Sequence, residues 1–144
     1  MHDKPRFRDA AISDAAPLAR LAGELGYPTS TEEMTHRLAM LLSQHHHGIL
    51  VAELESIVGW IHVSHMVSLE SDAFAEIRGL VVAESHRGAG IGAHLVSLAE
   101  VWAKGHGCNR IRVRTNVVRD KTRKFYGRLG FQSKKTQEVF DKTL

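Results

Sequence analysis

Apolar residues recur at helical spacing in two neighbouring segments near the start of the chain. The first runs from Ser13 or Asp14 to Leu25 and is followed by Gly26, and the second begins at Ser30. Ser30 has a glutamate three positions later, as in a capping box, and a glycine after an apolar stripe is typical of a helix end. The pattern predicts two consecutive amphipathic helices. Their buried stripes are expected to be Leu18, Leu21, Ala22 and Leu25, and Met34, Leu38, Leu41 and Leu42.

Shorter apolar runs bounded by turn residues predict strands. A glycine-rich segment opens a third helix that carries Leu95 and Trp102, and a fourth helix runs from Asp120 to Leu129. The expected order is β-α-α-β-β-β-α-β-α-β. It predicts a single α/β domain over residues 1–144, with about four helices on a mixed, mostly antiparallel sheet of about six to seven strands. The predicted strands are Phe7–Ile12, Ile49–Glu53, Ile57–Val67, Phe74–Val82, Ile111–Asn116 and Phe131–Phe140.

Composition places the chain among folded domains without disulfide bonds. Apolar residues make up 43% of the 144 and charged residues 24%, which is enough apolar material for a core. Cys108 is the only cysteine, so an internal disulfide and a cysteine-based zinc site are excluded and a reducing compartment is favoured. No apolar run is long enough to span a membrane, and the segment MHDKPRFRDA lacks the apolar core of a signal peptide. We therefore expect a soluble, cytoplasmic protein with no membrane partner.

Charge is divided unevenly between the two halves. Residues 1–72 hold five Lys and Arg against ten Asp and Glu, whereas residues 73–144 hold fourteen against six. The densest basic stretch is 110–124. By charge alone this stretch fits a solvated face, a phosphate-bearing small molecule or a nucleic acid. Aromatic residues are only 6% of the chain and no nucleic-acid motif is present, so we expect no nucleic-acid partner.

A glycine-rich loop carries the main chemical signal. The segment Arg87-Gly88-Ala89-Gly90-Ile91-Gly92 lies between an apolar strand and an amphipathic helix. Glycines let the backbone approach a ligand closely, and the start of a helix adds N–H groups and a positive dipole end. The segment therefore predicts an anion cradle of the kind that holds a pyrophosphate, although a connector without a ligand has the same pattern.

Two other phosphate motifs fit this loop less well. Walker A requires Gly-Lys-Ser/Thr after the glycines, and that sequence is absent. The dinucleotide fingerprint matches Gly88-x-Gly90-x-x-Ala93, but only 52 residues follow Gly92, too few for the remaining βαβ units. The next strand also ends in basic residues rather than in an acidic residue that would hold a ribose.

Read as Arg87-x-x-Gly90-x-Gly92, the loop resembles the acyl-CoA pyrophosphate motif of the GNAT N-acetyltransferase superfamily. The segment Phe125-Tyr126-Gly127-Arg128-Leu129-Gly130-Phe131 resembles the family's FYxxLGF signature, and the element order of the whole chain is similar to the family's. The resemblance implies that acetyl-CoA binds between the strands Phe74–Val82 and Ile111–Asn116. The implied contacts are Arg87, Gly88, Ala89, Gly90, Ile91 and Gly92 for the pyrophosphate, and Leu80, Val81 and Val82 for the pantetheine arm.

The same resemblance implies two catalytic residues. Tyr126 matches the tyrosine near the thioester sulfur and would protonate the departing CoA thiolate. Glu76 has the spacing of the general base in a branch of the family that includes histone acetyltransferases. An amine with a pKa of about 10 must lose a proton before it attacks. Strand alternation puts Glu76 on one face with Arg78, Leu80 and Val82, so a salt bridge to Arg78 is the alternative role of Glu76.

The chain departs from the family pattern just before the fourth helix. Arg119 stands where many members carry asparagine, and Asn116 lies one turn earlier. Asn116 is a candidate for the hydrogen bond to pantetheine, and Arg119 is a candidate for a phosphate contact. Lys124, at the end of the basic stretch, is expected to meet the adenosine-side phosphates.

Further residues are expected at the acceptor site. In the family the loop between the first two helices lines this site, which selects Tyr27. Trp60 and His62 share a face of the strand beside the one that carries Glu76, and the acidic first half favours a cationic amine. The run His45-His46-His47 invites a metal site, but consecutive residues do not converge on one ion, so no metal is expected.

These observations predict an N-acetyltransferase that moves the acetyl group of acetyl-CoA to a primary amine of a small molecule or peptide. Two alternatives stay open. One is a non-catalytic acyl-CoA sensor on the same fold, and the other is a nucleic-acid-binding module that uses residues 110–124. A homodimer is compatible with the resemblance, although no residue points to it.

Overall fold

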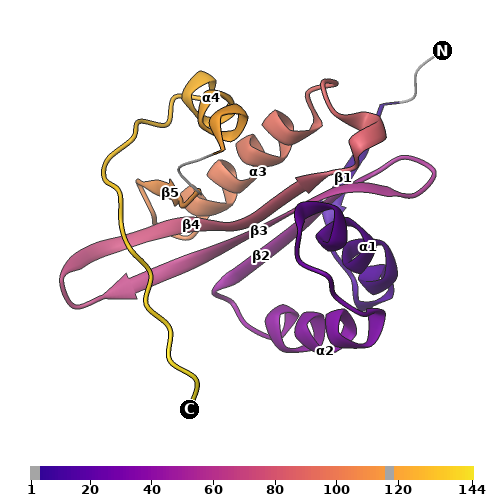
Figure 1. Ribbon diagram of the computed structural model, residues 1–144, viewed down its shortest axis with the longest axis horizontal. Coiled ribbons are helices and arrows are strands. Elements are labelled where there is room, and N and C mark those ends of the chain that lie inside the picture. Colours follow the sequence, from indigo (N-terminus) through magenta and orange to yellow (C-terminus); the bar gives the residue numbers. More distant parts are fainter. Residues whose placement is uncertain (1–3, 116–118) are drawn as a thin grey trace. The chain divides into compact units, whose positions relative to one another are not determined.

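The strands form one five-stranded sheet in the order β1-β2-β3-β4-β5 (Figure 1). The first three pairings are antiparallel, and β4 pairs with β5 in parallel. The computed structural model describes residues 4–115 and 119–144. Its strands and α-helices are β1 (Arg6–Asp9), α1 (Ala15–Leu25), α2 (Thr31–Leu42), β2 (His47–Glu53), β3 (Ile57–Ser68), β4 (Ser71–Val82), α3 (Ile91–Gly105), β5 (Ile111–Val113) and α4 (Asp120–Arg128), with short 3-10 helices at Ile12–Asp14 and Glu84–His86. The predicted mixed, mostly antiparallel α/β fold is confirmed.

The chain divides into two compact units, Met1–Val113 and Arg114–Leu144. The first unit holds the whole sheet and three helices: α1 and α2 cover one face of the sheet, and α3 covers the other (Figure 1). The second unit holds α4 and the segment that follows it. No helix in the described part of the chain is long and apolar enough to cross a membrane.

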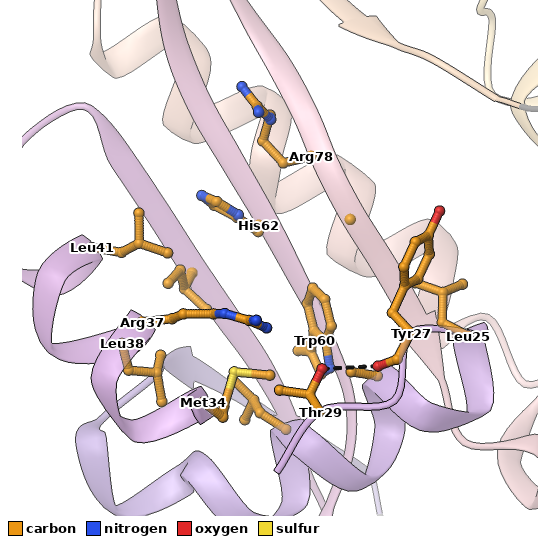
Figure 2. Close-up of a pocket in the computed structure, with 14 residues that line it drawn as sticks. Leu25, Tyr27, Thr29, Met34, Arg37, Leu38, Leu41, Trp60, His62 and Arg78 are labelled. Atoms are coloured by element: carbon orange, nitrogen blue, oxygen red, sulfur yellow. Dashed lines mark hydrogen bonds between the residues drawn. The ribbon is translucent and has the colours of Figure 1, made fainter. Parts of the chain in front are cut away.

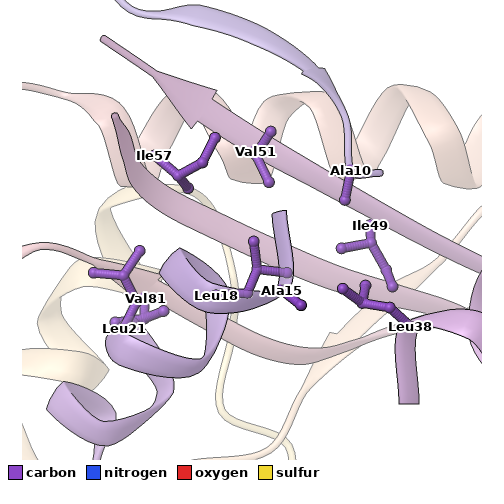
Figure 3. Packing of buried hydrophobic residues seen from close by; sticks show 9 residues of the cluster. All are labelled: Ala10, Ala15, Leu18, Leu21, Leu38, Ile49, Val51, Ile57 and Val81. Carbon is purple, nitrogen blue, oxygen red and sulfur yellow. The ribbon is translucent and has the colours of Figure 1, made fainter. Parts of the chain in front are cut away.

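The first two helices begin and end where the sequence predicts. The Ser30 hydroxyl accepts a hydrogen bond from the Glu33 N–H, and the Ser30 N–H donates to the Glu33 carboxylate, both over 3.0 Å. Gly26 ends α1 with a φ of 104°, a conformation that glycine adopts without strain. The apolar stripes of both helices then pack on the sheet (Figure 3), except for Leu42 at the end of α2, which is exposed rather than buried as expected. The buried cluster contains Ala10, Ala15, Leu18, Leu21, Leu38, Ile49, Val51, Ile57 and Val81.

The opposite face of the sheet packs closely against α3. Leu95, Val96 and Ala99 of this helix are buried. Gly48 on β2 leaves room for the helix, because a Cβ there would overlap the indole of Trp102. A Cβ at Gly59 of β3 would come to within 3.4 Å of the Leu95 Cδ1, which is contact distance. The sheet therefore has an apolar environment on both faces over its middle strands.

An extra residue in β4 shifts the alternation of that strand. His62 of β3 lies opposite Gly79, and the next residue of β3 lies opposite Ile77, so Arg78 is left without a partner position. A bulge of this kind exchanges the faces of all residues beyond it. Gly79 therefore shares a face with His62, on the side that α1 and α2 cover.

This bulge corrects one expectation from the sequence. Glu76 lies opposite Ser64, whereas Leu80 lies opposite Ile61. Ser64 and Ile61 are an odd number of residues apart in β3, so they face opposite sides of the sheet. Glu76 consequently does not share a face with Leu80, as simple alternation predicts, because the bulge lies between them.

Some strand predictions are also wrong. Phe131–Phe140 is not a strand, since residues 131–144 form neither helix nor strand, and the described residues contain five strands rather than about six to seven. The physical reason is visible in the sequence: no apolar residue stands between Phe131 and Val139, so the segment offers no alternating face to bury. The strand that begins at Ile111 ends at Val113, and Asn116 lies outside the described residues.

The contact between β2 and α3 leads to a stability prediction. A Cβ at Gly48 would lie 2.5 Å from the Trp102 Nε1, and this indole is stacked on His106 with 3.8 Å between ring centroids. We expect Gly48→Ala to lower the free energy of unfolding by about 1–3 kcal/mol, because the indole must move out of a packed position.

Gly23→Ala is the matched control for this substitution. Gly23 lies inside α1, and a Cβ there would meet open space, so alanine is expected to raise the free energy of unfolding by about 0.5–1 kcal/mol. Urea unfolding followed by circular dichroism measures both variants. Equal stability of Gly48→Ala and the unchanged chain would contradict the close packing of α3 on β2.

Candidate active site

A pocket of about 420 Å³ lies between the α1–α2 pair and strands β2, β3 and β4 of the first unit (Figure 2). Apolar side chains of the two helices form much of its wall, among them Leu18, Leu25, Met34, Leu38 and Leu41. A largely apolar cavity of this size with a few polar side chains is typical of a small-molecule site. The pocket is therefore the candidate acceptor site.

Three residues that the sequence assigns to the acceptor meet in this pocket. Tyr27 comes from the loop after α1, and Trp60 and His62 come from one face of β3. The Thr29 hydroxyl donates a hydrogen bond to the Tyr27 carbonyl over 2.8 Å, which holds the loop at the rim. The structure brings the three residues together, and their part in substrate binding stays a prediction.

Two arginines also line the pocket, and sequence reasoning did not assign either to the acceptor. Arg37 extends from α2 into the pocket in the direction of Trp60, and Arg78 stands beyond His62 at the bulge in β4 (Figure 2). Arg37 follows Met34 by three positions, so helical spacing places it on the same face of α2 as a residue of the apolar stripe. This spacing could have identified Arg37 as a pocket residue. No such signal identifies Arg78, because its position depends on the bulge.

Two imidazoles at this end of the pocket form a hydrogen-bonded pair. His47 Nδ1 and His62 Nε2 are 2.9 Å apart across β2 and β3. Burial is the main cause that lowers the pKa of His62 to about 4, and the positive charges of His47 and Arg78 lower it further. His62 is therefore neutral at pH 7. In the ranges that the structure describes, no group of three or more His, Cys, Asp and Glu could hold a metal ion.

Glu76, the predicted base, is buried in the sheet and does not belong to the pocket's described lining. Its Oε2 lies 3.7 Å from the Arg78 Nη1, and its side chain is only 7% exposed. Across the strands it lies opposite Ser64 on β3 and Arg112 on β5. The salt bridge that is the alternative role of Glu76 is thus present, and the role as base stays a prediction.

The glycine-rich loop presents backbone donors to solvent. Gly88 and Gly90 have φ values of 86° and 85°, which glycine adopts without strain. Gly90 is the N-cap of α3, and no side chain of the described residues caps this end. The Arg87 Nε donates to the Val82 carbonyl over 3.1 Å, so its side chain turns back toward β4. The N–H groups of the first turn of α3 can therefore donate hydrogen bonds to a bound anion.

The strand that leads into this loop has an open edge. Ala75–Ile77 of β4 pair with Ile111–Val113 of β5. In the described ranges, no strand pairs with residues 78–82 on that side. This stretch contains Leu80, Val81 and Val82, the residues expected to meet the pantetheine arm. An unpaired strand edge can hydrogen-bond an extended ligand as it would another strand.

The second unit contains the remaining predicted residues. Tyr126 of α4 is buried and makes edge contacts with the rings of Phe125 and Phe131. Burial raises the pKa of Tyr126 to about 12, so its hydroxyl is protonated at pH 7. Lys124 forms an exposed ion pair with Asp120 over 3.2 Å, which is a weak interaction. The residue before α4, Arg119, is also exposed, and its contact with a phosphate stays a prediction.

Comparisons with known proteins agree with the motifs. The model of the acetyltransferase (GNAT) family matches residues 15–131. An aminoglycoside N(6')-acetyltransferase type 1 from Serratia marcescens is 27% identical over 126 residues, which cover 82% of this chain and 86% of that protein.

Solved structures with the same fold cover almost the whole chain. Glucosamine-6-phosphate N-acetyltransferase from Arabidopsis thaliana is similar with a TM-score of 0.84 at 23% identity, over 96% of this chain and 99% of that one. AAC(6')-Iy in complex with the bisubstrate analog CoA-S-monomethyl-acetylneamine is similar with a TM-score of 0.86 at 17% identity, over 99% and 100%. At these identities the likeness shows the fold alone.

The partly buried imidazole pair leads to a prediction about acid stability. An unfolded chain binds a proton at His62 below its ordinary pKa of 6.5, whereas the folded chain binds it only near pH 4. Stability that depends on this group is therefore present above pH 6.5 and is lost as the pH falls toward 4. Between pH 7 and pH 5, proton binding at His62 is expected to lower the free energy of unfolding by about 1–2 kcal/mol.

We expect His62→Gln to remove this share of the pH dependence. Urea unfolding at pH 7 and pH 5 should give a smaller difference for His62→Gln than for the unchanged chain. His36→Gln, on the exposed side of α2, controls for the loss of a histidine as such. An unaltered difference in His62→Gln would mean that the ring is not held neutral by burial.

Proposed function

Because the chain belongs to the acetyltransferase (GNAT) family, we propose that it transfers the acetyl group of acetyl-CoA to a primary amine by direct attack. The observation that carries the proposal is the open edge of β4, which is followed, after a short 3-10 turn and the glycine-rich loop, by the uncapped N-terminus of α3. The family match runs through both units, which supports one catalytic domain over residues 1–144. The single cysteine, Cys108, favours the cytoplasm as its location.

The residues of the first unit fit acetyl-CoA. A pyrophosphate needs several donors without bulky side chains in front of them, and the backbone from Arg87 to Gly92 offers them with open space at Gly88 and Gly90. An extended pantetheine arm needs a row of backbone groups, which the edge of residues 78–82 provides. Acetyl-CoA supplies the activated acetyl group as a thioester.

Three proton transfers accompany the proposed reaction. The acceptor ammonium loses a proton to Glu76, directly or through water, and the free amine forms the new C–N bond at the acetyl carbon. The C–S bond then breaks, and the CoA thiolate takes a proton from Tyr126. The nitrogen of the new amide gives up its second proton, directly or through water, and this proton restores the Tyr126 hydroxyl. Its pKa of about 12 keeps Tyr126 protonated until the thiolate forms. Backbone N–H groups near Val82 would stabilise the oxyanion between the two steps.

Calorimetric titration with acetyl-CoA tests the loop. Gly90→Glu should abolish micromolar binding, because the substitution puts a negative charge and a strained φ at the place proposed for the pyrophosphate. Gly107→Glu is a matched control, since Gly107 has a φ of 78° and open space at the other end of α3. Equal binding by both variants would refute the proposed phosphate site.

A pH–rate profile tests the proposed base. Glu76→Gln should lower kcat by about 10²- to 10⁴-fold at pH 7 and recover part of it at high pH, where the amine has already lost its proton. Asp72→Asn, an exposed carboxylate of the same strand, is the control. An unchanged kcat in a folded Glu76→Gln variant would exclude the base role. Acetyl-CoA binding without turnover of any amine would favour the sensor alternative.

A further inference from the structure

The polar side chains that line the pocket are dominated by hydrogen-bond donors. Arg37 and Arg78 can only donate, and both carry a positive charge. The indole N–H of Trp60 is buried and has no hydrogen-bond partner among the described residues. The Nε2 of His62 is engaged with His47. A ligand that fits this lining brings acceptor atoms and negative charge.

The acidic residues that favour a cationic amine in the sequence do not reach the pocket. No Asp or Glu belongs to its described lining. The Glu24 carboxylate accepts a hydrogen bond from the Glu84 N–H over 3.0 Å, and Glu33 caps α2. Glu32 is exposed on the first turn of α2. A polycation in the pocket would therefore meet two guanidinium groups and no carboxylate of the lining.

We propose that the pocket binds an amine acceptor that carries a carboxylate or phosphate group, that Arg37 holds this anion, and that the positive charge of Arg78, beyond His62, favours it further (Figure 2). The inference rests on the proposed acetyl transfer and names the class of its acceptor. A charged group of this kind binds arginine through paired, charge-assisted hydrogen bonds. The apolar wall formed by Leu38, Leu41 and their neighbours would contact the carbon skeleton.

The existing ion pairs leave both arginines able to bind a ligand. Arg37 lies 3.6 Å from Glu33, and both side chains are more than half exposed, so water screens this pair. Arg78 lies 3.7 Å from Glu76 and is 45% exposed. Its charge nevertheless reaches the pocket, because Arg78 itself lines it. After burial, this charge is a further cause of the lowered pKa of His62 and His47.

Matched acceptors test the inference through kinetics of the full chain. Glucosamine 6-phosphate is compared with glucosamine to test a phosphate as the anion. Leucine is compared with leucinamide to test a carboxylate as the anion. Spermidine and kanamycin represent polycations. We expect kcat/KM to be about tenfold or more higher for the anionic member of at least one pair. Preference for the polycations, or for the neutral member of both pairs, would overturn the inference.

Arg37→Gln should remove the preference. The ratio of kcat/KM between the anionic and the neutral member should fall about tenfold, mainly through KM, while the neutral member changes little. Arg6→Gln, an exposed arginine of β1, should leave the ratio unchanged. An unchanged ratio in Arg37→Gln would show that this arginine does not hold the anion.

A binding measurement separates this inference from the proposed function. In ¹H–¹⁵N spectra the indole N–H of each tryptophan gives its own signal. Trp60 lines the pocket, whereas Trp102 lies on α3. Glucosamine 6-phosphate or leucine should shift the Trp60 signal in a saturable manner, more weakly in Arg37→Gln, and leave Trp102 unchanged. No shift with either anion overturns the inference even if acetyl-CoA binds. Loss of acetyl-CoA binding with an intact shift refutes only the acetyl transfer.

Discussion

The bulge at Arg78 is the constraint on which the pocket side of the sheet depends. Because β4 gains one residue there, Val81 turns toward α1 and joins the buried cluster with Leu21. Gly79 turns to the same side, where a Cβ would lie 3.0 Å from the ring of Trp60. The absence of a side chain at Gly79 lets the indole lie against the strand. Without the extra residue, Val81 would face α3 and the floor of the pocket would be rebuilt.

The same bulge determines the electrostatics of the pocket. Arg78 is released from the ladder of paired residues, and its guanidinium lies near the buried Glu76 as well as the histidine pair. A partly exposed arginine can change partners at low cost, whereas the nearly buried carboxylate needs compensation. The neutral state of His62 follows from burial first and from this positive charge second. Net charge over half of the chain therefore says little about the potential inside the pocket.

Local signals in the sequence account for most of the fold. The Ser30–Glu33 box, Gly26 and the spacing of apolar residues predict the helices, and the two motifs identify the family correctly. The grouping of Tyr27 with Trp60 in one pocket was also predictable. The bulge was not predictable, because the sequence around Arg78 fits an uninterrupted alternation of faces. The faces assigned to Leu80 and Val82 are wrong for that reason. The predicted last strand is absent because Phe131–Phe140 has no alternating apolar face between its two ends.

Two kinds of surface serve the two proposed substrates. The open edge of β4 and the uncapped end of α3 offer backbone groups, which depend on glycines and on chain geometry rather than on side-chain identity. The pocket offers side chains such as Arg37, which can change without disturbing the strands. Acceptor specificity can therefore diverge while the proposed cofactor surface is kept. Solved proteins with this fold accordingly carry names as different as AAC(6')-Iy and glucosamine-6-phosphate N-acetyltransferase. The identity of the acceptor therefore depends on the lining of this chain's own pocket, above all on Arg37.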